Sequence, residues 1–328
     1  MIRANVIERA DEIRSAFQNA SPFRHACIEN FLDEDIAKQA LADFPDFDED
    51  AARNEFGDVG RKAVNTDLPR ISPFYARLSD YLVSDDFVNA MSALTGIAGL
   101  KPDVNQFGGG THENLDGQSL DPHVDFNYDM ATGRHRRINL LIYLNPVWDE
   151  AWGGCIELHR NPRDPEHDET AAFAPLFNRA VMFETNEHSW HGFRRIAIPP
   201  GSPVQSRKCL SIYLYTDDRP EDEIAPPHGT FYVPPPLPDT LVEGHTLTGE
   251  DIAEIRDRIQ RWSHWLEFHQ KRELRMSREI EDLRVMVAPE AHYINRGVRH
   301  HVAAMLREAG EVVIALGNAV GRLFGRNR

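Results

Sequence analysis

The chain has 328 residues, with 52 acidic and 36 basic side chains and a formal net charge of −16. This acidity argues against nucleic-acid binding, which needs cationic side chains to neutralise phosphates. Its three cysteines, Cys27, Cys155 and Cys209, are too few and too widely spaced for a disulfide framework. The sequence has no signal-like amino terminus and no apolar run long enough to span a membrane, so we expect a cytoplasmic protein of one large or two modest domains.

Helical and strand patterns alternate in the first hundred residues. Apolar residues recur at helical spacing over 2–18 and again over 72–98, and each stretch predicts a helix with one buried face. Residues 26–32 read as a strand, after which Asp33 predicts the start of a helix that stops at Pro45. The glycines at 108–110 lack the lysine of a phosphate-binding loop, so we interpret them as a flexible lip over a site.

From about residue 100 to 217, short apolar segments are separated by Gly, Pro and Asn. This pattern is typical of an all-β sandwich or jelly roll. His159 and His167 lie in or beside a charged, proline-containing loop, and we expect both side chains to be solvated.

His123 and Asp125 are candidate metal ligands. Because residues two apart on a β-strand point to the same face, a strand over 121–126 would let both side chains reach one ion. His191 offers a third ligand further along the chain. Two imidazoles and one carboxylate on one face of a metal leave positions open, as in non-haem Fe(II) oxygenases. A single His-x-Asp triplet is weak support for a metal site in a chain with 15 histidines. The segments around it are therefore needed to decide whether these residues bind a metal.

Those segments follow the triplet in a specific order. The apolar strand 137–145 ends in Tyr-Leu-Asn, a Gly-Gly turn lies at 153–154, the distal His191 comes next, and the basic pair Arg207-Lys208 opens a last strand up to Tyr215. This order resembles the 2-oxoglutarate/Fe(II)-dependent dioxygenases of the prolyl 4-hydroxylase-like type, and the resemblance covers roughly residues 22–220.

The resemblance implies a fold and a set of site residues. The fold would be α+β with a mainly β catalytic core, namely a double-stranded β-helix (jelly roll) with supporting N-terminal helices. His123, Asp125 and His191 match the iron ligands. Arg207 matches the residue that holds the distal carboxylate of 2-oxoglutarate, although the neighbouring Lys208 stays an alternative. The cosubstrate pocket would also include Tyr143, Cys209 and Ser211, because alternation places Cys209 and Ser211 on the face of Arg207.

The resemblance also implies a reaction. Iron, 2-oxoglutarate and O2 would be needed, with ascorbate as an auxiliary reductant. The enzyme would hydroxylate an unactivated C–H bond of a peptide residue or a polar small molecule, and would release succinate and CO2. Asp125 favours hydroxylation, since the related iron halogenases lack this carboxylate. Two alternatives are a cupin-like metalloenzyme that does not use 2-oxoglutarate and a catalytically inactive jelly-roll protein that binds partners through its tail.

The C-terminal part differs in composition. We place the oxygenase domain at 1–240 and a helical region at 241–328, after a stiff proline-rich segment. Residues 248–251 form a capping-box pattern. A heptad seam over 252–287, which Pro289 should end, predicts either a homodimeric coiled coil or a hairpin with a final helix over about 295–324. Association of that last helix with a membrane surface is a third interpretation.

Overall fold

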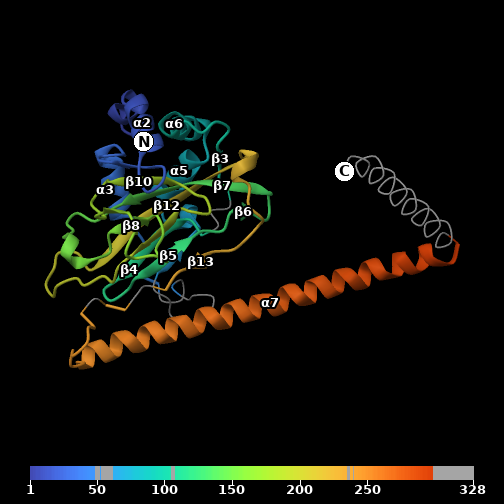
Figure 1. The fold of residues 1–328 in the computed structure, drawn as a ribbon. Coiled ribbons are helices and arrows are strands. Elements are labelled where there is room, and N and C mark those ends of the chain that lie inside the picture. Colours follow the sequence, from blue (N-terminus) through green and yellow to red (C-terminus); the bar gives the residue numbers. More distant parts are fainter. Residues whose placement is uncertain (49–51, 53–61, 105–107, 235–236, 239, 298–328) are drawn as a thin grey trace, which may run out of the picture. The chain divides into compact units, whose positions relative to one another are not determined.

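The computed structural model describes residues 1–48, 52, 62–104, 108–234, 237–238 and 240–297 (Figure 1). The chain forms two compact units, Met1–Arg258 and Ile259–Arg328. In the part of the chain that the structure describes, all strands lie in the first unit.

The first unit begins with short helices. Two predicted helices each divide into two, and the second division occurs because the Ser84 hydroxyl accepts a hydrogen bond from the Phe87 amide at 3.3 Å and starts a new helix. Asp33 stands at the predicted helix start, but its side chain makes no capping bond. The helices are α1 (Ala4–Glu8), α2 (Ala10–Asn19), α3 (Glu34–Ala42), α4 (Leu68–Ile71), α5 (Pro73–Leu82) and α6 (Asp85–Thr95), with two 3-10 turns, η1 (Glu150–Trp152) and η2 (Glu221–Glu223).

The strands form two antiparallel sheets, which confirms the mainly β core. The larger, eight-stranded sheet has the order β1-β10-β7-β12-β4-β2, with β3 and β6 attached to it, and the smaller, five-stranded sheet has the order β13-β5-β11-β8-β9. The strands are β1 (His25–Ile28), β2 (Ala63–Asn65), β3 (Lys101–Pro102), β4 (Gly110–Leu115), β5 (Leu120–Val124), β6 (Tyr128–Asp129), β7 (Arg134–Tyr143), β8 (Ile156–His159), β9 (Thr170–Phe173), β10 (Ala180–Glu184), β11 (Trp190–Phe193), β12 (Ser206–Thr216) and β13 (Phe231–Tyr232).

The two faces of the large sheet have different surroundings. Ile138, Leu140 and Ile142 of β7 belong to the main apolar core together with residues of α2, α5 and α6. The alternate residue Tyr143 instead packs with Ile156 and Leu158 of the small sheet. Figure 1 shows helices α2, α3, α5 and α6 on one side of the large sheet and the small sheet on the other. Period-2 alternation therefore gives β7 and β12 a helix-facing side and a side that faces the space between the sheets.

The helix α7 (Gly249–Gly297) follows the β core. The predicted capping box is confirmed, because the Asp251 carboxylate accepts from the Thr248 amide at 2.8 Å and the Thr248 hydroxyl accepts from the Asp251 amide at 3.2 Å. The expected end at Pro289 is wrong. A proline removes one amide donor, but neighbours such as Ala288 and Glu290 have high helix propensity, and the helix continues. The final helix predicted for 295–324 lies almost wholly outside the described residues. No described helix is apolar enough over sufficient length to cross a membrane.

Gly110, at the start of β4, lies where the backbone of β2 approaches closely. Its φ is +98°, and an added Cβ would lie 2.1 Å from the Asn65 carbonyl oxygen. We expect Gly110→Ala to lower the free energy of unfolding by about 2–5 kcal/mol, from left-handed strain and overpacking together. Gly133→Ala, at φ +72° with open space around it, should cost only the strain of about 1–2 kcal/mol. Urea unfolding of both variants makes the comparison, and equal losses would contradict it.

Candidate active site

Two histidines from neighbouring strands face each other in the small sheet. His123 on β5 is directly opposite His191 on β11, and the ring centroids are 4.2 Å apart. Each side chain is only about 5 % exposed. Cross-strand neighbours on one face of a sheet lie close enough to share a ligand, so strand pairing brings together two residues that are distant in the sequence.

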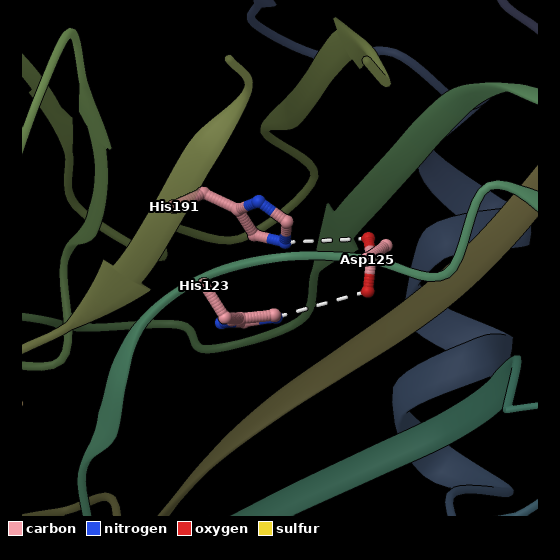
Figure 2. A group of neighbouring side chains, drawn as sticks. All are labelled: His123, Asp125 and His191. Atoms are coloured by element: carbon pink, nitrogen blue, oxygen red, sulfur yellow. Dashed lines mark ion pairs between the residues drawn. The ribbon is translucent and has the colours of Figure 1, made fainter. Parts of the chain in front are cut away.

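Asp125 completes a cluster of three possible ligands. Its Oδ1 lies 3.8 Å from His123 Nε2 and its Oδ2 lies 3.5 Å from His191 Nε2 (Figure 2). One ligand atom from each of the three residues lies within 4.8 Å of the others. The predicted strand over 121–126 is too long, since β5 ends at Val124. Asp125 therefore approaches the histidines from the segment after the strand.

Backbone hydrogen bonds orient both imidazoles for metal binding. His123 Nδ1 lies 3.0 Å from the Asp121 carbonyl oxygen, and His191 Nδ1 lies 2.8 Å from the Ser189 carbonyl oxygen. A carbonyl only accepts, so each Nδ1 carries the proton and each Nε2 presents a lone pair to the cluster. Burial, helped by His191, lowers the pKa of His123 to about 3, and burial also lowers the pKa of His191. Neutral imidazoles with convergent Nε2 atoms fit a divalent metal ion.

The carboxylate of Asp125 is held by two side chains of β7. Asn139 Nδ2 donates to its Oδ2 at 2.7 Å, and Arg136 Nη2 lies 3.1 Å from the same oxygen. Arg136 also donates to Asn139 Oδ1 and stacks 3.6 Å from the ring centroid of Tyr213. Burial alone would raise the pKa of Asp125, but Arg136, the two histidines and Asn139 lower it below its usual range. The carboxylate is therefore ionised.

Arg136 was missed in the sequence because strict alternation places it on the opposite face from Asn139. The pairing of β7 with β12 shifts register between Leu214 and Tyr215, so that Leu214 pairs with Ile138 and Tyr215 pairs with Arg136. Arg137 is the extra residue of this β-bulge. A β-bulge changes the direction of the side chains next to it. Arg136 consequently points into the space between the sheets, where it is only 1 % exposed.

Arg207 is the second buried cation of the site. Its Nε donates to the Gly154 carbonyl at 2.7 Å and its Nη2 donates to the Tyr143 hydroxyl at 2.9 Å. The guanidinium carbon lies 4.3 Å from the Phe193 ring centroid. Lys208 leaves β12 on the other face, where its Nζ lies 2.5 Å from Glu113 Oε1. Of the two basic neighbours, Arg207 is therefore the one that points between the sheets.

Cys209 and Ser211 share the inward face of β12 with Arg207. Cys209 pairs with Tyr143 on one side and with His112 on the other, so these three side chains form one row across the large sheet. Burial raises the pKa of the Cys209 thiol to about 12 and lowers that of His112. Both groups are therefore neutral, and each donates to a backbone carbonyl: His112 Nε2 to Gly108 at 2.9 Å and Cys209 Sγ to Leu210 at 3.5 Å. His112 was missed in the sequence analysis, because only the register of β4 with β12 reveals it.

Other candidates stay outside the site. The prediction that His159 is solvated is wrong: it lies in β8, is 7 % exposed, and its Nδ1 is 2.7 Å from Asp168 Oδ2. His167 is exposed as expected. His159 alternates with Leu158, which packs between the sheets, so His159 points to the far side of the small sheet and supports only its loop.

Most of the β core matches a known protein family. Residues 109–215 match the model of the 2OG-Fe(II) oxygenase superfamily. This segment is a 2OG-Fe(II) oxygenase domain. The predicted superfamily is confirmed for this segment, and the predicted enzyme class and its cofactors, Fe(II) and 2-oxoglutarate, agree with the match. The oriented cluster of two buried histidines and the half-buried Asp125 independently fits the metal.

Solved structures of similar fold include other oxygenases. A prolyl hydroxylase from Trichoplax adhaerens, in complex with a peptide fragment of a hypoxia inducible factor, has 16% identity and a TM-score of 0.45 over 65% of this chain and 91% of its own. A prolyl 4-hydroxylase from Phytophthora capsici has 17% identity and a TM-score of 0.45 over 78% and 74%. HygX from Streptomyces hygroscopicus, with nickel and 2-oxoglutarate bound, has 13% identity and a TM-score of 0.41 over 64% and 91%. No curated protein sequence matches this oxygenase.

The Asp125–Arg136 pair gives a stability prediction for the metal-free oxygenase. Removing one partner of a buried ion pair leaves an uncompensated charge and costs about 3–5 kcal/mol. We expect Asp125→Ala to lose about this much unfolding free energy, whereas Asp125→Ala/Arg136→Met should recover most of it because neither charge then stays buried. Urea denaturation in the presence of a chelator measures Asp125→Ala, Arg136→Met and the double variant. A double variant whose loss equals the sum of the two single losses would contradict the pairing.

Proposed function

We propose that His123, Asp125 and His191 hold the iron, and that the enzyme hydroxylates an unactivated C–H bond of a peptide residue or a polar small molecule, with release of succinate and CO2. The observation that carries this proposal is the convergence of the three ligand atoms beside the buried Arg207. When bound, iron supplies the activation of O2 that is coupled to decarboxylation of 2-oxoglutarate. The carboxylate of Asp125 occupies a metal position and favours hydroxylation over halogenation.

Arg207 binds the distal carboxylate of 2-oxoglutarate in this proposal. It is 4 % exposed, and within the described ranges no carboxylate forms an ion pair with it. Its guanidinium meets a carbonyl, a phenol and two aromatic faces, which leaves its charge available to a ligand. An arginine fork can bind a carboxylate through two charge-assisted hydrogen bonds. Tyr143 supports the same carboxylate through its hydroxyl, and Cys209 and Ser211 line the pocket beside it.

Aromatic side chains pack against both histidines of the proposed site. His123 stacks on Tyr232 of β13, with ring centroids 5.0 Å apart, and His191 packs against Phe183 of β10 at 4.6 Å. These aromatic neighbours restrict the two imidazoles to one orientation and surround them with apolar surface. A dry, preorganised site strengthens the interactions of charged ligands and limits unproductive reactions.

Anaerobic titration of the purified protein with Fe(II) and then 2-oxoglutarate tests the proposed site. We expect the weak visible charge-transfer band of the iron–2-oxoglutarate chelate in the wild-type protein. Arg207→Met should need about 100-fold more 2-oxoglutarate, because the loss of a buried charge partner costs about 3 kcal/mol. Lys208→Met is the matched control. It keeps a similar aliphatic stem but alters the outward face, so its 2-oxoglutarate affinity should stay at the wild-type level.

Each of the other possible outcomes would contradict a different part of this proposal. Weakened binding only in Lys208→Met would transfer the carboxylate site to Lys208. Metal binding without 2-oxoglutarate affinity would favour a metalloenzyme that uses another substrate. Absence of metal uptake, with the fold intact by circular dichroism, would overturn the oxygenase assignment.

We further propose that α7 pairs with α7 of a second copy through residues 252–287. Apolar side chains on the helix recur at intervals of three and four and are exposed, among them Ile259 at 59 %, Trp262 at 65 %, Leu266 at 56 % and Leu283 at 60 %. His269 and Glu273 interrupt the seam, but a row of exposed large apolar side chains is typical of a surface that binds a partner. Heptad spacing gives a partner helix a matching seam.

Light scattering of the full chain after size exclusion tests this pairing. We expect a dimer for the wild-type protein and a monomer for Ile259→Lys/Leu266→Lys, because lysines at the seam would each bury a charge. Lys271→Ala removes an exposed residue that pairs with Glu267 and should leave the dimer intact. A wild-type monomer would contradict the proposal. Unchanged 2-oxoglutarate titration in the double variant would show that cosubstrate binding does not need the pairing.

A further inference from the structure

Lys62 lies at the edge of the site and has no role in the reaction described above. It immediately precedes β2, whose Val64 pairs with His112 of β4, and His112 pairs with Cys209 of β12. Directly opposed residues share a face of a sheet, and alternate residues return to it. Strand register therefore places Lys62 on the inward face, in line with Arg207 across the intervening β4.

The surroundings of Lys62 confirm this direction. Its ammonium group interacts electrostatically with Asp125, Arg136 and Arg207, which all surround the metal site. Burial is the largest cause that lowers the pKa of Lys62, and Asp125 opposes this effect. Among the residues that the structure describes, none forms a hydrogen bond or an ion pair with the Lys62 side chain. A cation therefore points into the site without a partner in the visible part of the fold.

Among the described residues, the charges around the site do not balance without a further anion. Fe(II) and 2-oxoglutarate carry equal and opposite charges, and Arg136 is paired with Asp125. Arg207 and Lys62 then remain as excess positive charge inside a chain whose net charge is −16. Uncompensated charge in a buried site is unfavourable, and a cationic site within an acidic protein selects anionic ligands by electrostatic complementarity.

We propose that Lys62 forms a subsite that binds an anionic group, a carboxylate or a phosphate, of the primary substrate beside the metal. The inference rests on the proposed oxygenase function and narrows its substrate class to acidic compounds. Lysine suits this role because its ammonium group is a compact charge with three donors on a flexible stem. The substrate anion pairs with the Lys62 ammonium group, and this contact positions a nearby C–H bond at the metal. Arg207 stays committed to 2-oxoglutarate.

The test uses the full chain loaded with Mn(II) and saturating 2-oxoglutarate under anaerobic conditions. Paramagnetic relaxation of ³¹P in inorganic phosphate and of the carboxyl ¹³C in acetate reports anions that bind near the metal. For the wild-type protein we expect saturable relaxation of the observed nucleus in at least one of the two anions. The anion that responds shows whether the subsite prefers a phosphate or a carboxylate. Lys62→Met should weaken that binding about tenfold or more. Lys38→Met, an exposed lysine on α3 that pairs with Glu34, should not.

A parallel 2-oxoglutarate titration distinguishes a failure of the Lys62 proposal from a failure of the proposed oxygenase function. In Lys62→Met the 2-oxoglutarate affinity should stay within about twofold of wild type, because Arg207 holds the cosubstrate. A loss as large as that of Arg207→Met would assign Lys62 to the cosubstrate and overturn the proposal. Relaxation by neither anion, or relaxation that persists in Lys62→Met, would also overturn it. Failure of the wild-type protein to bind Mn(II) and 2-oxoglutarate would instead contradict the oxygenase function. If Lys62→Met does not fold, Lys62→Arg must retain anion binding.

Discussion

The buried ion pair between Asp125 and Arg136 is the interaction on which the site depends. Asp125 follows the end of β5 in the small sheet and Arg136 belongs to β7 in the large sheet, so their 3.1 Å contact joins the two sheets at the proposed metal position. A buried carboxylate and a buried guanidinium are each costly alone and acceptable together. The same contact ionises the proposed ligand and directs it toward His123 and His191.

This pairing is possible because the large sheet has two different faces. Its helix-facing side is apolar and contributes to the main core, whereas its inward side carries Asn139, Tyr143, Arg207 and Cys209. The helix-facing side of the large sheet therefore contributes most of the apolar packing, whereas the inward side carries the residues of the proposed site. A bulge at Arg137 interrupts the alternation at the one point where an additional inward cation is needed. Bulges next to active sites commonly serve to re-aim a side chain in this way.

Charge distribution distinguishes the inside of this protein from its outside. The chain as a whole is strongly acidic, yet Arg136 pairs with Asp125, and Lys62 interacts electrostatically with Asp125, Arg136 and Arg207. Such an arrangement suits reactants that are themselves anions, of which 2-oxoglutarate is one. The acidic exterior therefore contrasts with an interior whose cationic side chains complement the acidic ligands proposed for the site.

The sequence by itself determined the residue types and local patterns of this protein: the His123, Asp125 and His191 set, the mainly β core, the basic residue that opens β12, and the cap at Thr248. These depend on spacing along the chain, which a sequence displays directly. Only the tertiary structure decided that Arg207 rather than Lys208 faces inward and that Arg136, His112 and Lys62 surround the site. It also decided that His159 is buried and that α7 passes Pro289. The physical reason is that strand register, bulges and burial arise from pairing between distant segments, and neither periodicity nor composition encodes that pairing locally.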